Sequence, residues 1–477
     1  MPPARPADVR ASGWGWRYAT RRRAAVHELD LVIEPGERVL LLGASGSGKS
    51  TLVHALAGVL GGDDEGEQFG RLAVDGRPPG EQRGRAGLVL QDPESQVILS
   101  RVGDDVAFGC ENLGVPREDI WPRVRESLDA VGLDVPLDRS TSELSGGQKQ
   151  RLALAGVLAM QPGLLLLDEP TANLDPAGVI EVRDAVSRVL DRTGATLVVI
   201  EHRVETWLPL VERVVVLAPG GGVLADGAPD VILGRSADHL AAAGVWVPGR
   251  PRVVPQRLRR EGAHLLQAVD LSFGRTAPVH APVTLSATAG RALALTGPNG
   301  SGKTTLGHTL AGLLPPLGGS LEALPELHSG AGASPIRWRS RELLTRIGTV
   351  FQEPEHQLLS TTVRRELEVG PRALGLSAAE TARRVDELLG RLRLDALAEA
   401  NPFTLSGGEK RRLSVATVIA TRPRMLVLDE PTFGQDARTW AEQVALLCEL
   451  LDEGRAIVAM THDAEFVDAL ADERVEL

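Results

Sequence analysis

The sequence predicts an α/β protein made of two similar domains. Its 477 residues, 43% of them apolar, exceed what one ordinary hydrophobic core accommodates and suit two domains of roughly 200 to 250 residues each. Five short motifs occur twice, in the same order, about 260 residues apart. In the first copy an apolar run at Arg38–Leu42, a glycine-rich turn and the helically spaced apolar residues of Ser50–Leu60 predict strand, loop and helix. We therefore expect one α/β domain that has been duplicated whole.

The composition disfavours several classes of protein. No apolar run approaches the ~18 to 20 residues needed to cross a bilayer, so we expect no membrane-spanning segment. The opening residues lack the apolar core of a secretory signal, and only two cysteines, Cys110 and Cys448, occur, which favours a cytosolic compartment. The formal net charge of −11 disfavours nucleic acid as a partner, because phosphate neutralisation needs clustered Lys and Arg.

The join between the two copies is expected near Pro255. The segment Val245–Gly262 is rich in Pro and Arg and shows no clean helical or strand period. We place the first domain at residues 1–245, a Pro/Arg-rich linker at 246–262 and the second domain at 263–477. A linker of about twenty residues can connect two packed domains without dictating their arrangement.

Two glycine-rich loops carry the first chemical signal. GASGSGKS in the first copy returns as GPNGSGKT in the second, and both match the GxxxxGK[ST] pattern of a phosphate-binding P-loop. Glycines let backbone N–H groups crowd around a polyphosphate, and the following helix adds its positive N-terminus. We expect Lys49 and Lys303 to reach the terminal phosphates. The residues predicted to bind ATP here are Gly43, Ala44, Ser45, Gly46, Ser47, Gly48, Lys49, Ser50, Thr51, Gly297, Pro298, Asn299, Gly300, Ser301, Gly302, Lys303, Thr304 and Thr305.

A pair of acidic residues follows an apolar strand in each copy. LLLLDEPT in the first copy returns as MLVLDEPT in the second, which places Asp168 and Asp429 at the carboxyl ends of strands, where open α/β sheets hold their ligands. We expect these aspartates to hold Mg²⁺. The next residues, Glu169 and Glu430, would orient and deprotonate the attacking water. An Asp-Glu pair alone could instead cap a helix, but the upstream P-loop favours the catalytic interpretation.

The motifs LSGGQ and LSGGE each precede a helical segment and form a second anion site in each domain. This combination resembles the ATP-binding-cassette (ABC) ATPase family, in which the signature motif of one domain closes over the nucleotide held by the P-loop of its partner. The resemblance extends from Trp14 to about Asp463, with every motif in order in both halves. It implies two P-loop domains, each with a RecA-like core, a helical subdomain and an antiparallel β subdomain.

The resemblance also implies roles for individual residues. Catalysis would involve Glu169, Glu430, the switch histidines His202 and His462, and the Q-loop glutamines Gln91 and Gln352. The Mg²⁺ ligands would come from Ser50, Thr304, Gln91, Gln352, Asp168 and Asp429. The signature residues that contact ATP would be Ser145, Gly147, Ser406 and Gly408, and the aromatic residues that stack on adenine would be Tyr18 and Phe273.

The same resemblance implies two composite ATP sites, each pairing the P-loop of one half with the signature motif of the other. Both sites keep their glutamate and histidine, so we expect both to hydrolyse ATP. The second half departs from the first at Glu409, which replaces glutamine, and at Phe433-Gly434-Gln435-Asp436, which follows its DEPT motif. Because of these departures, the two sites need not hydrolyse ATP at equal rates.

The residues after each Q-loop resemble the ATPases of energy-coupling-factor importers, which take up vitamins, vitamin precursors or Co and Ni ions. The strings QDPESQ and QEPEHQ carry this resemblance, together with the VAFG and ENLGVPR elements of the first half. It implies a transmembrane coupling subunit and a small membrane subunit that captures substrate, with the chain on the cytoplasmic face of the membrane. Glu94 and Glu355 would then meet basic residues of the coupling subunit, or lie as solvated loop carboxylates.

Two other classes of function are open alternatives. A soluble tandem ABC ATPase that acts on the ribosome or on DNA tends to carry a long basic linker helix or a metal-binding insertion, and this chain has a short Pro-rich join and an acidic balance. A P-loop kinase or transferase would need an acceptor-substrate domain, and the two copies leave no residues for one.

Overall fold

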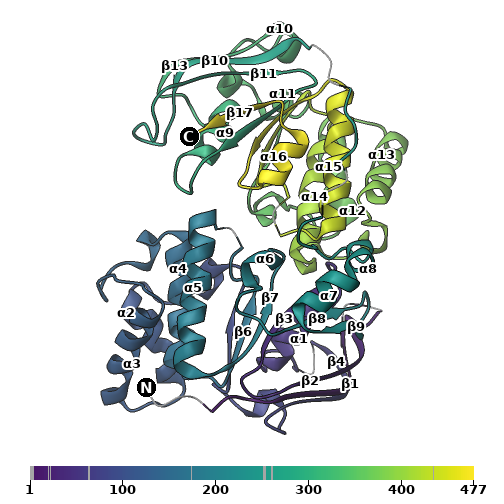
Figure 1. Ribbon diagram of the computed structural model, residues 1–477. Helices are drawn as coiled ribbons and strands as arrows, with labels where there is room; N and C mark the ends of the chain where they lie inside the picture. Colours follow the sequence, from purple (N-terminus) through teal and green to yellow (C-terminus); the bar gives the residue numbers. More distant parts are fainter. Residues whose placement is uncertain are drawn as a thin grey trace. The chain divides into compact units, whose positions relative to one another are not determined.

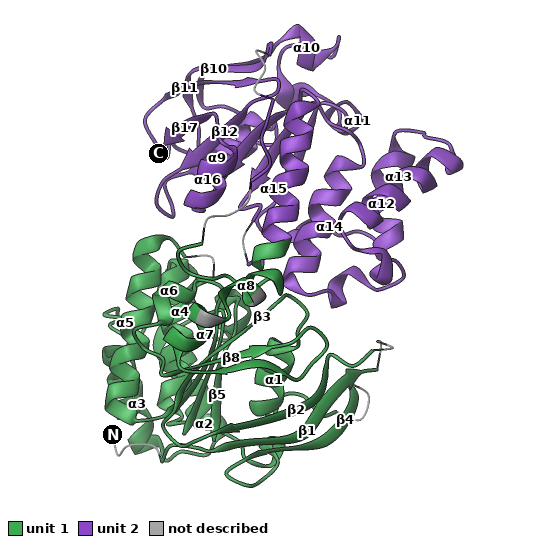
Figure 2. Cartoon of the chain, turned by 45° about the vertical axis from the view of Figure 1, so that its right-hand side comes forward, with its two compact units in different colours: residues 1–250, 436–438 green, residues 251–435, 439–477 purple. Residues whose placement is uncertain are grey.

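The computed structural model describes residues 5–19, 21, 23–62, 65–172, 174–250, 254–258, 262–432 and 434–477. It divides into two compact units, residues 1–250 with 436–438 and residues 251–435 with 439–477 (Figure 2). Asn173 and Phe433, which belong to the segments after the two DEPT motifs, lie outside the described residues, as do parts of the predicted linker.

The first unit is built on a six-stranded sheet whose central strands are apolar and fully buried. Its strand order is β5 (Ala86–Val89), β6 (Leu164–Asp168), β7 (Thr196–Ile200), β3 (Arg38–Gly43), β8 (Arg213–Leu217) and β9 (Val223–Gly227). Neighbouring strands are parallel except β9, which runs antiparallel to β8. Parallel strands buried on both faces are expected to be near-continuous Val, Ile and Leu, as these are.

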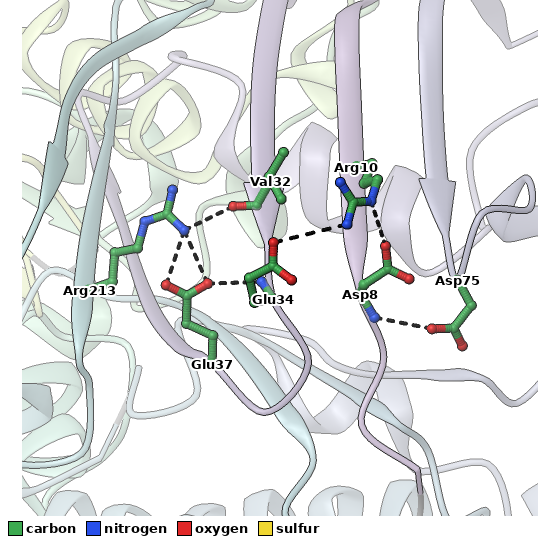
Figure 3. A network of polar contacts seen from close by, with 7 residues as sticks. All are labelled: Asp8, Arg10, Val32, Glu34, Glu37, Asp75 and Arg213. Atoms are coloured by element: carbon green, nitrogen blue, oxygen red, sulfur yellow. Dashed lines mark hydrogen bonds and ion pairs between the residues drawn. The ribbon is translucent and has the colours of Figure 1, made fainter.

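A second, antiparallel sheet of the first unit has the order β2 (Val26–Ile33), β1 (Val9–Tyr18) and β4 (Gly66–Val74). Figure 3 shows the polar network that joins it to the core sheet. Arg213 of β8 donates to the Val32 carbonyl at 2.9 Å and to the Glu37 carboxylate at 3.0 Å. The network continues through Glu34 to Arg10, which donates to Asp8 at 2.9 Å. A guanidinium with several oxygen partners therefore fixes the strand entering the P-loop.

The helices of the first unit fall into a group that covers the core sheet and a group that forms a separate helical layer. Helices α2, α3 and α4 pack together through a shared apolar cluster (Figure 1). The helix bounds are α1 (Lys49–Leu56), α2 (Val102–Asn112), α3 (Arg117–Ala130), α4 (Gly146–Ala159), α5 (Pro176–Thr193), α6 (Val204–Trp207), α7 (Pro229–Arg235) and α8 (Ala237–Ala242).

The second unit repeats this plan. Its parallel sheet has the order β14 (Ile347–Val350), β15 (Met425–Asp429), β16 (Ala456–Met460), β12 (Ala292–Thr296) and β17 (Glu473–Glu476), and its antiparallel sheet has the order β11 (Val283–Thr288), β10 (His264–Ser272) and β13 (Gly318–Ala323). The helices are α9 (Lys303–Leu310), α10 (Pro325–His328), α11 (Ser340–Leu343), α12 (Val363–Ala373), α13 (Ala378–Arg391), α14 (Gly407–Ile419), α15 (Ala437–Asp452) and α16 (Ala464–Leu470). Each unit is thus an α/β core with a helical subdomain and an antiparallel β subdomain, as the sequence predicted.

The chain enters the second unit through a residue of the predicted linker. The Arg257 guanidinium is almost fully buried and pairs with Asp472 at 3.0 Å. It also donates to the carbonyls of Leu470 at 2.6 Å and Gly290 at 3.0 Å. These charge-assisted bonds anchor residues 254–258 to the second unit. No helix among the described residues is long and apolar enough to cross a membrane.

Candidate nucleotide-binding sites

Each P-loop wraps from a core strand into a helix through a left-handed glycine. Gly48 has φ 91° and precedes α1, and Gly302 has φ 99° and precedes α9. A Cβ on Gly48 would lie 2.4 Å from a Val26 methyl, and one on Gly302 would lie 2.7 Å from a Val279 methyl. Both the backbone conformation and the close approach therefore require glycine here.

The two P-loop lysines are buried and occupy equivalent positions. The Lys49 ammonium donates to the Gly43 carbonyl at 2.8 Å and to the Ala44 carbonyl at 3.1 Å. Lys303 donates to Gly297 and Pro298 at 2.9 Å each. Burial lowers the pKa of Lys49, and the carboxylates of Glu169 and Asp168 oppose this shift. A desolvated cation inside a loop of backbone N–H groups is suited to a polyphosphate.

A hydroxyl and a carboxylate meet below each P-loop. The Thr304 hydroxyl donates to Asp429 at 2.8 Å, and in the first unit the nearby Ser50 side chain acts to lower the pKa of Asp168. Hydroxyl and carboxylate oxygens beside a phosphate site are ligands that Mg²⁺ accepts, together with phosphate oxygens and water. Two further P-loop hydroxyls, of Ser47 and Ser301, are buried without a hydrogen-bond partner. The residues present fit a Mg²⁺-nucleotide.

The predicted catalytic glutamates both adopt a left-handed backbone. Glu169 has φ 49° and Glu430 has φ 45°, and both follow directly on the strands β6 and β15. Their N–H groups donate to the neighbouring strand at 2.9 Å, to Ile200 and Met460 respectively. Positive φ in a residue with a side chain stores strain and is concentrated at functional sites.

In the first unit, two predicted site residues converge on Glu169. The His202 Nε2 lies 3.1 Å from Glu169 Oε1, and Gln91 donates its amide to Glu169 Oε2 at 2.8 Å. Burial opposes ionisation, but the adjacent His202 and Lys49 outweigh it and lower the pKa of Glu169. Burial and the charge of Glu169 instead raise the pKa of Asp168 to about 7.

In the second unit, the partners of Glu430 differ. Its carboxylate accepts from the Thr461 hydroxyl at 3.2 Å and from the His462 N–H at 3.4 Å. The His462 ring lies 3.6 Å from Glu430 and bonds Asn299 of the P-loop at 2.8 Å. Burial and the charge of Asp429 raise the pKa of Glu430 to about 7.

Gln352 makes no side-chain hydrogen bond to the described residues, and its side chain is exposed.

A buried cation of the second unit, Arg411, has no equivalent in the first. Arg411 donates to the Phe351 carbonyl at 3.1 Å and to the Asp429 carbonyl at 3.4 Å. Burial lowers its pKa to about 10.

The signature motifs begin helices α4 and α14, as predicted. The Ser145 N–H donates to Gln148 at 3.0 Å, and the Gln148 N–H donates back to the Ser145 hydroxyl at 3.3 Å. The Ser406 N–H donates to Glu409 at 2.8 Å. Glu409 therefore keeps the bond to the serine N–H that glutamine makes in the first unit. Gly147 and Gly408 occupy the first turn of each helix.

Tyr18 and Phe273 do not occupy equivalent positions. Tyr18 ends β1 half-buried, with its hydroxyl 3.2 Å from that of Thr51 and the Arg21 guanidinium 5.9 Å from its ring centroid. Phe273 is 0% exposed, and its ring is stacked with His280 at a centroid separation of 6.3 Å. A fully buried ring has no face for adenine, so the stacking predicted for Phe273 is not supported.

The register of the antiparallel sheets explains this correction. β1 is irregular between Ser12 and Gly15, and β10 is irregular in the same way between Val269 and Ser272. When these two irregular positions are aligned, the buried Trp16 of β1 corresponds to Phe273 of β10. Tyr18 then corresponds to the exposed Arg275. The second unit therefore lacks an aromatic residue at the position of Tyr18.

Several polar residues of the site were not predicted from the sequence. Gln96 and Gln357 brace the two Q-loops: each amide donates to a carbonyl of the preceding strand and accepts the N–H of residue 90 or 351. Buried Glu201 accepts from the Thr171 N–H at 2.9 Å and from the Thr171 hydroxyl, and in the second unit Asp463 accepts from the Thr432 hydroxyl at 2.8 Å. The second glutamine of the QxPExQ string recurs in both halves, and this recurrence was the sequence signal for its bracing role.

The two Q-loop carboxylates pair within their own units. Glu94 bonds the Lys149 ammonium, and Glu355 bonds the Lys410 ammonium. Each pair joins the Q-loop to the helix that begins at the signature motif. The Glu94 side chain is 62% exposed and that of Glu355 is 54% exposed, so both carboxylates stay at the surface, and contact with a coupling subunit stays a prediction.

Known proteins resemble this chain over most of its length. The family model described as ABC transporter matches residues 26–172 and 281–433. A putative HMP/thiamine import ATP-binding protein of Bacillus subtilis is 35% identical over 95% of this chain and 87% of its own length. A putative ABC transporter ATP-binding protein of Streptomyces avermitilis is 35% identical over 95% of this chain and 89% of its own.

A solved archaeal ribosome recycling factor, in complex with a ribosomal stalk protein, has the same fold. It covers 97% of this chain and 87% of its own with a TM-score of 0.61 and 21% identity. The paired P-loops, the paired signature helices and the extent of these matches lead to one conclusion: the chain belongs to the ABC transporter family and is a tandem ATP-hydrolysing ABC ATPase.

Proposed function

We propose that the chain is the ATP-hydrolysing energy-coupling subunit of a membrane importer of the energy-coupling-factor type. It would act at the cytoplasmic face of the membrane with a transmembrane coupling subunit and a small membrane subunit that captures a vitamin, a vitamin precursor or Co or Ni. The 35% identity to a relative described as a putative import ATP-binding protein supports this proposal.

The observation that carries the proposal is an exposed apolar side chain after each Q-loop. Ile98 is 58% exposed and Leu359 is 78% exposed, and they stand at equivalent positions in the two halves. A single exposed apolar side chain is common on protein surfaces, but its recurrence at the same position of both halves favours contact with another protein.

The loops that carry these side chains are held rigidly. Asp105 accepts the N–H groups of Ile98 and Leu99 at 2.8 Å each. Glu366 does the same for Leu359 at 2.8 Å and Ser360 at 2.6 Å. A preorganised apolar side chain loses little conformational entropy on binding, so it is suited to anchor a membrane subunit beside the Q-loop.

ATP hydrolysis would use the same residue types in both units. Lys49 and Lys303 would neutralise phosphate charge. Asp168 with Ser50, and Asp429 with Thr304, would hold Mg²⁺, which would neutralise further charge on the phosphates. Glu169 and Glu430 would accept a proton from the attacking water, and His202 and His462 would hold that carboxylate and the γ-phosphate. The signature residues of one half would complete the site of the other, as in the family.

Affinity purification from detergent-solubilised native membranes tests this function. We expect the wild-type chain to recover one helical membrane subunit together with a small substrate-capturing membrane protein, identified by mass spectrometry. The variant Ile98→Glu/Leu359→Glu should lose these partners while keeping ATP hydrolysis.

The matched control is Phe69→Glu/Val269→Glu, which changes exposed apolar residues on the antiparallel sheets and should keep the partners. Recovery of ribosomal proteins or DNA-repair proteins in place of membrane subunits would refute the importer function and favour a soluble tandem ATPase.

A further inference from the structure

Two adjoining cavities of the second unit are lined by arginine. Their volumes are about 350 and 260 Å³, and Arg422, Glu453 and Arg455 line both. The arginine cluster, as we define it, consists of Arg384, Arg391, Arg422, Arg424 and Arg455. Five guanidinium groups lie at one place here, although the chain as a whole has a net charge of −11.

The arginine cluster is separate from the nucleotide site. Arg424 directly precedes β15, and Arg455 directly precedes β16. The P-loop and the acidic pair follow the carboxyl ends of the strands of this sheet, whereas the cluster lies at the amino ends. Arg384 and Arg391 come from α13, and Arg422 comes from the turn after α14.

Carboxylates pair with three of the five arginines: Glu380 with Arg384, Glu387 and Glu449 with Arg391, and Glu453 with Arg455. Arg422 and Arg424 have no carboxylate partner among the described residues. Three glutamates also line the cavities, Glu326, Glu387 and Glu453. Burial lowers the pKa of Arg384, and the nearby Arg422 contributes to the shift. Burial also lowers the pKa of Arg455, with Arg422 and Arg391 acting in the same direction against Glu453. Arg422 thus adds an unpaired positive charge beside the paired arginines, and a bound anion would offset its repulsion with them.

The hydrogen bonds of the cluster leave one guanidinium available. Arg384 donates to the Ala420 carbonyl at 2.9 Å, and Arg424 donates to the Glu326 carbonyl at 2.7 Å. Arg455 pairs with Glu453 at 3.1 Å. The Arg422 side chain is exposed and has no hydrogen bond or ion pair with any residue that the structure describes. It lines both cavities and can therefore reach a ligand in either.

Comparison with the first unit shows that the fold does not require these arginines. Aligning the helix ends and strand starts puts uncharged residues at four of the five positions, namely Ala130, Gln161, Gly163 and Ala195. The turn after the signature helix has the same backbone in both units, with φ 59° at Gln161 and φ 54° at Arg422. The turn tolerates a neutral residue, so its geometry does not explain the charge.

We propose that the arginine cluster is a binding site for a small polyphosphate anion. Guanidinium groups bind phosphate through paired hydrogen bonds, and two adjoining cavities that share Arg422 and Arg455 fit a ligand with at least two phosphate groups. The volumes favour a small molecule over a polymer. The inference is independent of the importer function, because it concerns a different edge of one unit.

Pyrophosphate is the probe, and isothermal titration calorimetry is the measurement. The full-length chain carries Lys49→Ala/Lys303→Ala as a background, which removes the P-loop lysines as competing sites. We expect saturable binding of one pyrophosphate per chain, weakened by added salt and tighter than orthophosphate. Arg422→Gln in this background should weaken binding at least about tenfold, the loss expected for one charge-assisted hydrogen bond.

Arg365→Gln is the matched control, because Arg365 is an exposed arginine of the same unit outside the cavities, and it should bind as the background does. Arg424→Gln is a second cluster variant and should weaken binding as well. Circular dichroism of each variant establishes that it is folded. Absence of saturable binding in the background chain, or an affinity in the Arg422→Gln and Arg424→Gln chains equal to that of the background chain, would overturn the proposal.

Discussion

The two nucleotide sites share one framework but surround their glutamates differently. In the first unit, Glu169 lies between Gln91 at 2.8 Å and His202 at 3.1 Å. In the second, Glu430 contacts Thr461 at 3.2 Å, while His462 bonds Asn299 of the P-loop at 2.8 Å.

These contacts shift the pKa values of the two carboxyl groups in opposite directions in the first pair, whereas in the second pair the pKa of Asp429 is raised as well as that of Glu430. The pKa of Asp168 is raised to about 7 in the first pair, where that of Glu169 is lowered. In the second pair the pKa of Glu430 is raised to about 7. Two buried carboxyl groups side by side do not both ionise easily. The same DE motif therefore holds a glutamate whose pKa is lowered in the first unit and one whose pKa is raised in the second.

The largest effect is expected when both glutamates are replaced. Glu169→Gln/Glu430→Gln should lower kcat for ATP hydrolysis by about 10³-fold, because a positioned general base contributes 10² to 10⁴-fold, while ATP binding is retained. Steady-state phosphate release and equilibrium ATP binding measure the two quantities. A double variant that keeps most of its turnover would refute the role assigned to these residues.

Replacing each of the two aromatic side chains by alanine should show which one contacts ATP and which one packs in the core. Phe273→Ala should lower the free energy of unfolding by about 3 to 5 kcal/mol, the usual cost for a buried phenylalanine. Tyr18→Ala should cost less stability and weaken ATP binding by the first unit. Denaturant unfolding and nucleotide titration of both variants check this. Equal stability losses would contradict the difference in burial.

The pH dependence of stability should differ in sign between the two glutamates. The pKa of Glu430 is raised from 4.5 to about 7, so the folded state binds an extra proton in this range and loses stability as the pH rises through it. Glu430→Gln should therefore gain about 1 to 3 kcal/mol relative to wild type between pH 5 and pH 8, without nucleotide.

Glu169→Gln is the matched variant. The pKa of Glu169 is lowered, so its ionised form stabilises the folded chain above its unfolded pKa, and this stability is lost as the pH falls. The variant should be destabilised relative to wild type at pH 8. Denaturant unfolding at the two pH values measures both variants, and the same sign for both would contradict the proton distribution.

The smallest effect is expected at the buried arginine of the second unit. Arg411→Gln installs the residue found at the equivalent position, Gln150, and removes donors to Phe351 and Asp429. We expect a loss of about 1 to 2 kcal/mol in the free energy of unfolding and a modest fall in turnover by the second site. Arg365→Gln serves as the control and should leave both unchanged.

The motifs allowed much of the fold and site to be predicted. Glycine-rich loops, apolar strands that end in Asp-Glu and capped helices are local patterns, and each forms where the sequence placed it. The position of Phe273 was not predictable, because the antiparallel sheets are offset differently from the rest of the repeat. The partners of Glu94 and Glu169 were not predictable either, since they depend on side chains that only the tertiary fold brings together.

We expect both units to hydrolyse ATP and the first, whose glutamate has a lowered pKa, to contribute the larger share near pH 7. Steady-state ATP hydrolysis by the single variants Glu169→Gln and Glu430→Gln, beside the double variant, tests it most directly. We expect both single variants to exceed the double variant, with the greater loss in Glu169→Gln. A Glu430→Gln chain as inactive as the double variant, beside a Glu169→Gln chain with wild-type turnover, would contradict the account.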